Sequence, residues 1–291
     1  MRWLRRTARV RLSALRDRAH TPGESGAERA NQQLIVELRT LTEKRDHDKA
    51  VALAEENLTR YSGDAAFLKQ ARATFNKAGA MTLHLEATRA QRRLDDNPKW
   101  AEREAVISGR WRETAADWRP EISGEPETLT PVSPSKVLHL LKISLPYRQS
   151  GYSVRSKYSL EGQLAAGLEP VAVTALGFPR SVGVTDAPEA DEIGGIRYRR
   201  LDPGAGYDTD APFDKYLTDF AQAAVPVVRE EKPAIIHVHS GHRGYDTALV
   251  GIELGKHFGI PVVYEVRGFF ESLWTSDTEW AERSETYRRR M

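Results

Sequence analysis

The stretch KVLHLLKI, residues 136–143, decides the fold of this chain. It is an almost unbroken apolar run, which is typical of a strand buried on both faces of a parallel sheet. A loop with Ser150-Gly151 follows, and then comes a helix of about fifteen residues that ends at Gly167. PVAVTAL, residues 170–176, is the next strand, so the segment predicts a strand–helix–strand unit.

The same alternation continues toward the C-terminus. Short β-branched runs are separated by longer helical patterns, with Gly or Pro at the junctions. The expected elements are strands over 193–201, 234–240 and 262–266 and helices over 213–231 and 245–258. Residues 136–291 are therefore predicted to form a Rossmann-like domain of the α/β class, built on a doubly wound parallel sheet.

Three other segments precede this domain. Residues 119–135 contain Pro120, Pro126, Pro131 and Pro134 and form a linker by composition. Residues 27–118 show helical periodicity and are predicted to be an all-α extension of helical hairpins. The stretch from Asp48 to Tyr61 resembles a tetratricopeptide-like hairpin, so the extension is either a module for a protein partner or a cover packed on the α/β domain.

Residues 1–22 form a basic arm, rich in arginine and amphipathic when drawn as a helix. Such an arm either contacts an anionic membrane surface, here through residues 1–20, or stays solvated. No apolar run is long enough for a membrane span, and no apolar core of a secretory signal follows the arginines. A cytoplasmic location is expected, peripheral at the inner membrane surface if the arm contacts lipid.

Composition excludes several classes of site. The 291 residues include no cysteine, which rules out disulfides, cysteine zinc sites and a cysteine nucleophile. The net charge is +2, so no global electrostatic signature points to a polyanion and no nucleic-acid partner is expected.

Ligands of open parallel sheets bind where the strands end at their carboxyl side. Ser150, Gly151 and Tyr152 follow the first strand and open a helix, where free backbone amides favour an anion. The alternative is a tight turn between strand and helix. Ser240 to Gly244 follow the 234–240 strand, and Arg267 to Glu271 follow the last one.

Two groups of polar residues at this edge leave alternatives open. His237, His239 and His242 resemble a metal cluster, yet no acidic residue is close in sequence, and strand histidines often pack against helices; no metal is expected. Arg267 either pairs with Glu265 or Glu271, or neutralises a phosphate or orients an acceptor hydroxyl.

The segments KVLHLLKISLPYRQSGYSVRSKYSLEGQLAAGLEPVAVTAL and KPAIIHVHSGHRGYDTALVGIELGKHFGIPVVYEVRGFFES resemble the N-terminal domain of family 4 glycosyltransferases. These are retaining enzymes of the GT-B fold that build bacterial polysaccharides and glycolipids. The resemblance covers roughly residues 136–291, and it rests on the combination of motifs rather than on one of them.

The resemblance implies roles for individual residues. Ser150, Gly151 and Tyr152 would bind the diphosphate of a nucleotide-sugar donor. His239, His242 and Arg243 would line the side of a saccharide or lipid-linked acceptor. Arg267 and Glu271 would be catalytic. Many members carry a histidine in the region of Arg267, and an arginine there implies an electrostatic role.

The family needs neither a metal nor another cofactor. Its second Rossmann domain, which holds most of the donor, is expected to be absent from these 291 residues, so the chain would be an inactive half by itself. The alternative is a non-catalytic scaffold with a relic Rossmann domain. A nicotinamide-dependent oxidoreductase is disfavoured because the glycine spacing is wrong.

Overall fold

The structure is a computed structural model that describes residues 26–208 and 211–291. The predicted basic arm over 1–22, with its membrane contact, lies outside the described residues. Within them, no helix combines the length and the apolar character that crossing a membrane requires.

The C-terminal part is built on one six-stranded sheet with the order β3-β4-β2-β1-β5-β6. All neighbouring strands run parallel except β3, which pairs with β4 in the antiparallel direction. The strands are β1 (Lys136–Leu141), β2 (Glu169–Thr174), β3 (Ala190–Ile193), β4 (Ile196–Arg199), β5 (Ile235–His239) and β6 (Val262–Glu265). The predicted α/β class with a mostly parallel sheet is confirmed, and the arrangement is compatible with a Rossmann-like fold.

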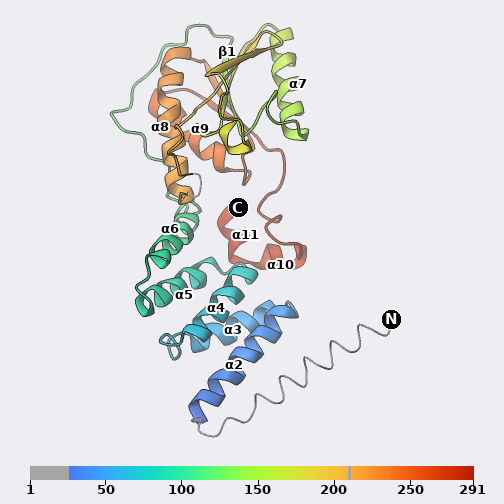
Figure 1. Cartoon of the computed structure of the whole chain (residues 1–291). Coiled ribbons are helices and arrows are strands. Elements are labelled where there is room, and N and C mark those ends of the chain that lie inside the picture. The colour runs from blue at the N-terminus through green and yellow to red at the C-terminus, as the bar shows by residue number, and fades with distance from the viewer. Residues whose placement is uncertain (1–25, 209–210) are drawn as a thin grey trace.

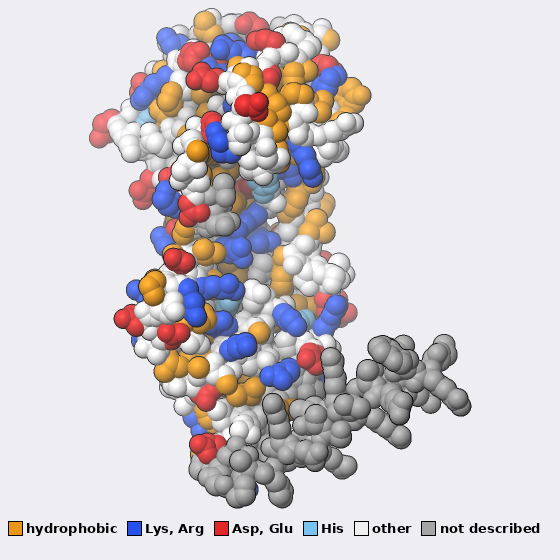
Figure 2. Space-filling view, viewed as in Figure 1, with side chains coloured by type: hydrophobic (Ala, Val, Ile, Leu, Met, Phe, Trp, Pro, Cys, Tyr) orange, Lys and Arg blue, Asp and Glu red, His pale blue; other side chains and the backbone are white. Residues whose placement is uncertain are grey.

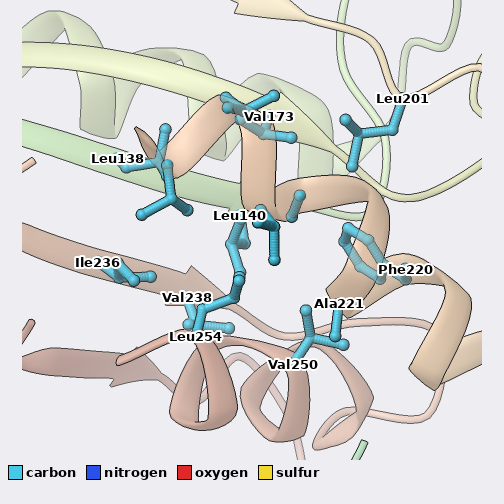
Figure 3. Close-up of a cluster of buried hydrophobic side chains, with 14 of the residues drawn as sticks. Leu138, Leu140, Val173, Leu201, Phe220, Ala221, Ile236, Val238, Val250 and Leu254 are labelled. Atoms are coloured by element: carbon cyan, nitrogen blue, oxygen red, sulfur yellow. The ribbon is translucent and has the colours of Figure 1, made fainter. Parts of the chain in front are cut away.

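Helices cover both faces of this sheet (Figure 1). α7 (Gly151–Ala165) packs on one face through Leu160, and α8 (Phe213–Glu231) and α9 (Asp246–Phe258) cover the other. Figure 3 shows the larger core, in which strand residues such as Leu140 and Val238 meet Phe220 of α8 and Val250 of α9. Alternating strand residues thus face opposite layers, and this is why the strands read as continuous apolar runs.

The strand predicted over 193–201 is shorter in the structure, β4, and another strand, β3, precedes it. Residues 190–199 form a β-hairpin, and a short 3-10 helix, η2 (Arg180–Val182), precedes it. Gly194 and Gly195 make the turn with φ angles of 61° and 77°. Two consecutive positive φ angles suit the tight turns of hairpins, so the Gly-Gly pair was the overlooked signal.

The N-terminal part is helical. Its helices are α2 (Gly26–Glu43), α3 (His47–Leu58), α4 (Ala65–Ala78), α5 (Met81–Leu94) and α6 (Pro98–Arg112). Asp64 caps α4 by accepting from the Phe67 amide, and Gly79 ends that helix with a left-handed φ of 67°. α6 leads to the sheet part and packs against α8.

The end of the described chain returns to these helices. α10 (Thr278–Arg283) and α11 (Glu285–Arg290) follow the sheet in sequence but lie beside α4 and α5 (Figure 1). The indole of Trp280 donates to the Ala78 carbonyl at 2.9 Å, and the Thr286 hydroxyl donates to the Gly79 carbonyl at 2.9 Å. Glu285 accepts from both the amide and the hydroxyl of Thr82. The chain therefore connects the helical part and the sheet part at two places, first after α6 and again where it returns to α10 and α11.

The proline-containing stretch 119–135 runs along α8 and the C-terminal end of α9. The amides of Glu127 and Leu129 donate to the carbonyls of His257 and Phe258, at 2.7 and 3.1 Å. Leu129 also packs on the larger core. The stretch carries no regular helix or strand, yet it is bound along its length to the domain that follows it.

Candidate functional site

The carboxyl ends of β1, β5 and β6 bring together most of the side chains that the sequence singled out. The contact that links them is made by Arg267, which follows β6. Its guanidinium donates to the Tyr152 carbonyl at 3.1 Å and to the Ser156 hydroxyl at 2.8 Å, both on α7. On the other side it donates to Glu265 at 3.0 Å. Loops that are far apart in sequence thus converge at one edge.

Ser150, Gly151 and Tyr152 form the N-terminus of α7. The Ser150 and Ser153 side chains each accept from the other's backbone amide, at 3.3 and 2.8 Å, in a reciprocal capping box. The amides of Gly151 and Tyr152 remain as first-turn donors without an intrahelical acceptor. A Cβ atom added to Gly151 would meet nothing within 4 Å, so the helix end opens to free space. This is the geometry of an anion-binding helix terminus.

Lys142, just after β1, adds a cation that the sequence reasoning missed. Its ammonium lies 3.4 Å from the centre of the Tyr152 ring and 5.5 Å from that of Phe270, and it donates to the Gly241 carbonyl at 3.3 Å. Burial lowers the pKa of Lys142, and the nearby Arg267 charge lowers it further. The signal was available, since a lysine directly after a central strand reaches the ligand edge of such a sheet.

Arg267 itself is enclosed. Its side chain is 2 % exposed, and its partner Glu265 is 21 % exposed. Although burial opposes the charged form, Arg267 and Arg155 hold the pKa of Glu265 below its ordinary value. The arginine is therefore paired with Glu265, one of the two alternatives that the sequence left open, and its field rather than a direct contact would reach a ligand at the surface. Glu271 lies half-buried in the loop that follows.

Three histidines form a chain of hydrogen bonds behind Arg267. His139 bonds to His239 at 2.8 Å and to the Gln163 side chain at 2.8 Å, and Gln163 contacts His237 at 3.3 Å. His239 also contacts Glu265 at 3.2 Å and the Arg267 guanidinium. Burial lowers the pKa of all three imidazoles, that of His139 to about 3, so they are neutral near pH 7.

These three imidazoles also bear on the metal cluster that the sequence analysis considered for His237, His239 and His242. Their ring nitrogens lie within 4.8 Å of one another, and His139 takes the place that the sequence reasoning considered for His242. His139 was overlooked because it lies about a hundred residues away and adjoins the others only through the β1–β5 pairing. The guanidinium that contacts His239 opposes a divalent cation there, because like charges at this range repel strongly.

His242 and Arg243 occupy the loop between β5 and α9. Their backbone amides both donate to the side chain of Asp246, the first residue of α9, at 2.9 and 3.0 Å. Burial lowers the pKa of the His242 imidazole. The Arg243 guanidinium extends to Glu113 after α6 and lies 3.7 Å from the centre of the Phe213 ring. The structure thus brings His239 and His242 to the edge but directs Arg243 toward the helical part.

Comparison with known proteins assigns no family. The sequence matches no protein-family model, and no curated protein shows significant similarity to it. The chemistry of the edge therefore has to be read from its own residues: an open helix terminus, a partly buried lysine, and neutral imidazoles ordered by a buried Arg–Glu pair.

Proposed function

We propose that residues 136–291 are the acceptor-side half of a GT-B glycosyltransferase of the family 4 type. Such an enzyme transfers a hexosyl unit, with retention of configuration, from a nucleotide-sugar to a saccharide or a lipid-linked acceptor. The observation that carries the proposal is the open N-terminus of α7 at Gly151, at the carboxyl edge of a parallel sheet. A diphosphate there would accept from first-turn amides and lie along the helix dipole.

The surrounding residues support the same chemistry. Lys142 is held beside Tyr152, where its charge would help to neutralise a leaving diphosphate without a metal ion. His242 has a neutral imidazole at the same edge, suited to orienting a sugar hydroxyl, whereas His239 is buried with both ring nitrogens engaged and would act by positioning Arg267. Arg267 orders the α7 terminus through Tyr152 and Ser156, so its role in catalysis would be electrostatic and positional, with Glu271 in the following loop.

The competing proposal is a non-catalytic scaffold that binds a protein through residues 27–118. The enclosure of Arg267 favours it, because a guanidinium that is 2 % exposed and already donates to Glu265 and α7 is not accessible to a phosphate. Binding of a nucleotide diphosphate at α7 separates the two proposals.

The test is a titration of the ¹⁵N-labelled chain with uridine diphosphate and guanosine diphosphate, followed through backbone amide shifts. Saturable shifts at Gly151 and Tyr152 are expected. Gly151→Val should abolish them because the side chain would fill the space that a phosphate needs, and that space is empty in the free protein. Gly162→Val is the matched control, on the same helix and with equally free space.

Unchanged amides at Gly151 with both nucleotides, or equal binding by Gly151→Val, would overturn the assignment of this loop. Where binding is seen, release of nucleoside diphosphate from UDP- and GDP-sugars by the natural gene product, isolated from its cells, tests transferase activity. The same product lacking turnover but retaining a tight protein partner would support the scaffold.

A further inference from the structure

A second polar site lies where the helical part meets the sheet part. A cavity of about 470 Å³ opens there, lined by α4, α5, α6, the β5–α9 loop and the segment that contains Trp274 and α11. On the face seen in Figure 2, Lys and Arg side chains gather across the middle of the molecule, between the sheet part and the helices. We call this the waist cavity, and it lies apart from the α7 terminus.

Positive charge dominates the lining. The cationic residues are Lys77, Arg110, Arg243 and Arg290. Glu113 is the acidic residue of the lining, and it is already engaged by Arg243 and by the Tyr245 hydroxyl, which donates to it at 2.7 Å. One carboxylate therefore faces several cations, and the excess charge is uncompensated.

Arg110 and Arg290 are the uncompensated pair. Neither forms a direct ion pair with a carboxylate among residues 26–208 and 211–291, although the charge of Glu113 acts on both at longer range. The pKa of Arg110 is lowered by burial and then by the charges of Arg243 and Arg290, which are close enough to repel it. Arg290 is half-buried and Arg110 is more exposed, and like charges held together in this way raise the free energy of the folded protein unless an anion joins them.

Two further donors lack acceptors. The indole nitrogen of Trp274 and the Nε atom of Arg290 are both buried, and neither has a hydrogen-bond partner within the part of the chain that the structure describes. Both residues line the cavity. A buried donor without a partner costs about 1–3 kcal/mol, so native proteins leave few of them without a reason.

The remaining lining indicates the shape of the ligand. Met81 and Ile107 present apolar surface next to the cations. The volume is that of sites for small organic molecules, and it is far larger than a bare inorganic ion needs. A ligand that fits would carry an anionic group at one end and an apolar or aromatic group at the other.

We propose that the waist cavity binds a small organic phosphate, whose phosphate accepts from Arg110, Arg290 and Trp274 while its apolar part lies against Met81 and Ile107. Arginine suits this task because its planar group donates two parallel hydrogen bonds to phosphate oxygens. Since the lining comes from α4, α6 and α11 together with the β5–α9 loop, the bound ligand would fasten the helical part to the sheet part.

The test uses phenyl phosphate as the probe and isothermal titration calorimetry of the full chain. Saturable binding with a single site is expected, at least tenfold tighter than that of inorganic phosphate, which lacks the apolar group, and of phenol, which lacks the charge. Benzoate distinguishes a carboxylate from a phosphate ligand, and tighter binding of benzoate than of phenyl phosphate would overturn the choice of a phosphate.

Variants place the probe. Arg110→Gln and Arg290→Gln should each weaken binding at least tenfold, whereas Arg93→Gln, an exposed arginine of α5, should leave it unchanged. Melting temperature is the second readout: without ligand, Arg110→Gln should be at least as stable as the unmodified protein, because it removes repulsion. Absence of phenyl phosphate binding, binding indifferent to both variants, or a marked loss of stability in Arg110→Gln would overturn the proposal. None of these outcomes bears on Gly151.

Discussion

Two arginine clusters in this molecule differ in whether a carboxylate pairs with the guanidinium. At the sheet edge, Arg267 is enclosed by Glu265, His239 and the first turn of α7, and only its Nε atom lacks a partner among the described residues. At the waist, Arg110 and Arg290 face a cavity without a carboxylate of their own. Both clusters join distant segments, yet only the first pairs its arginine with a carboxylate.

The difference separates structure from binding. A network whose charges are already paired fixes the position of its neighbours and has little capacity left for a ligand. An unsaturated one is stabilised by whatever supplies the missing charge. A nucleotide diphosphate is therefore expected to bind beside the sheet-edge cluster, at the open end of α7, whereas a small organic phosphate is expected to bind within the waist cavity itself.

The largest expected effect comes from removing the arginine that is paired with Glu265. Arg267→Met leaves Glu265 without its buried partner and should lower the free energy of unfolding by roughly 3–5 kcal/mol. Urea denaturation measures this. Arg155→Met is the matched control, because Arg155 pairs with the same carboxylate at 2.8 Å but its side chain is 60 % exposed, so the expected loss is below about 1 kcal/mol. Equal losses in the two variants would contradict the comparison.

A smaller effect is expected from the packing that closes the waist. Gly79 and Gly259 both end helices with a φ of 67°. An alanine at either pays about 1–2 kcal/mol for the left-handed backbone. At Gly79 its Cβ would also come 2.5 Å from the Trp274 ring, whereas at Gly259 the nearest atom, in Thr128, is at 3.4 Å.

Gly79→Ala should therefore be less stable than Gly259→Ala by a further 1–3 kcal/mol or so, and it should also weaken phenyl phosphate binding by displacing Trp274. Thermal unfolding and calorimetry of the two variants give the comparison. If both lose the same stability, Trp274 is not held against the helix end as the structure shows.

The smallest expected effect is a shift in the pKa of one imidazole, that of His84. Burial, together with the charges of Arg72, Arg103 and Arg110, lowers the pKa of His84 at the cavity wall to about 4. An anion in the cavity should raise that pKa by about one unit, because it offsets the arginine charges. Histidine NMR titration with and without phenyl phosphate measures it, and His47, whose pKa burial also lowers outside the cavity, should not move.

The lowered pKa of His84 also makes the stability of the folded protein depend on pH. The folded pKa of His84 lies below the unfolded value of 6.5, so its neutral form contributes stability that is lost as pH falls from about 6.5 toward 4. With phenyl phosphate bound, the loss should be smaller. A pH dependence of unfolding that the ligand leaves unchanged would argue against an anion near His84.

Local patterns determined much of this protein. The strand KVLHLLKI, the Asp64 and Ser150 caps and the Gly79 stop depend on residues within a few positions of one another, and such signals survive without a tertiary structure. The sheet order placed Ser150, His239 and Arg267 at one edge, because parallel strands end together. That much of the candidate site was predictable.

Tertiary structure alone decided the partners. His139 joins His239 across the β1–β5 pairing, Arg243 turns to Glu113, and α11 returns to Gly79 and Thr82. Each pairing depends on distances between segments that are remote in sequence, and the sequence pattern contains the residues but not the distances. Packing decides whether an arginine is paired with a carboxylate, as Arg267 is, or faces a cavity, as Arg110 does. The free-energy cost of burying a charge or of leaving it without a partner arises only once the chain has folded.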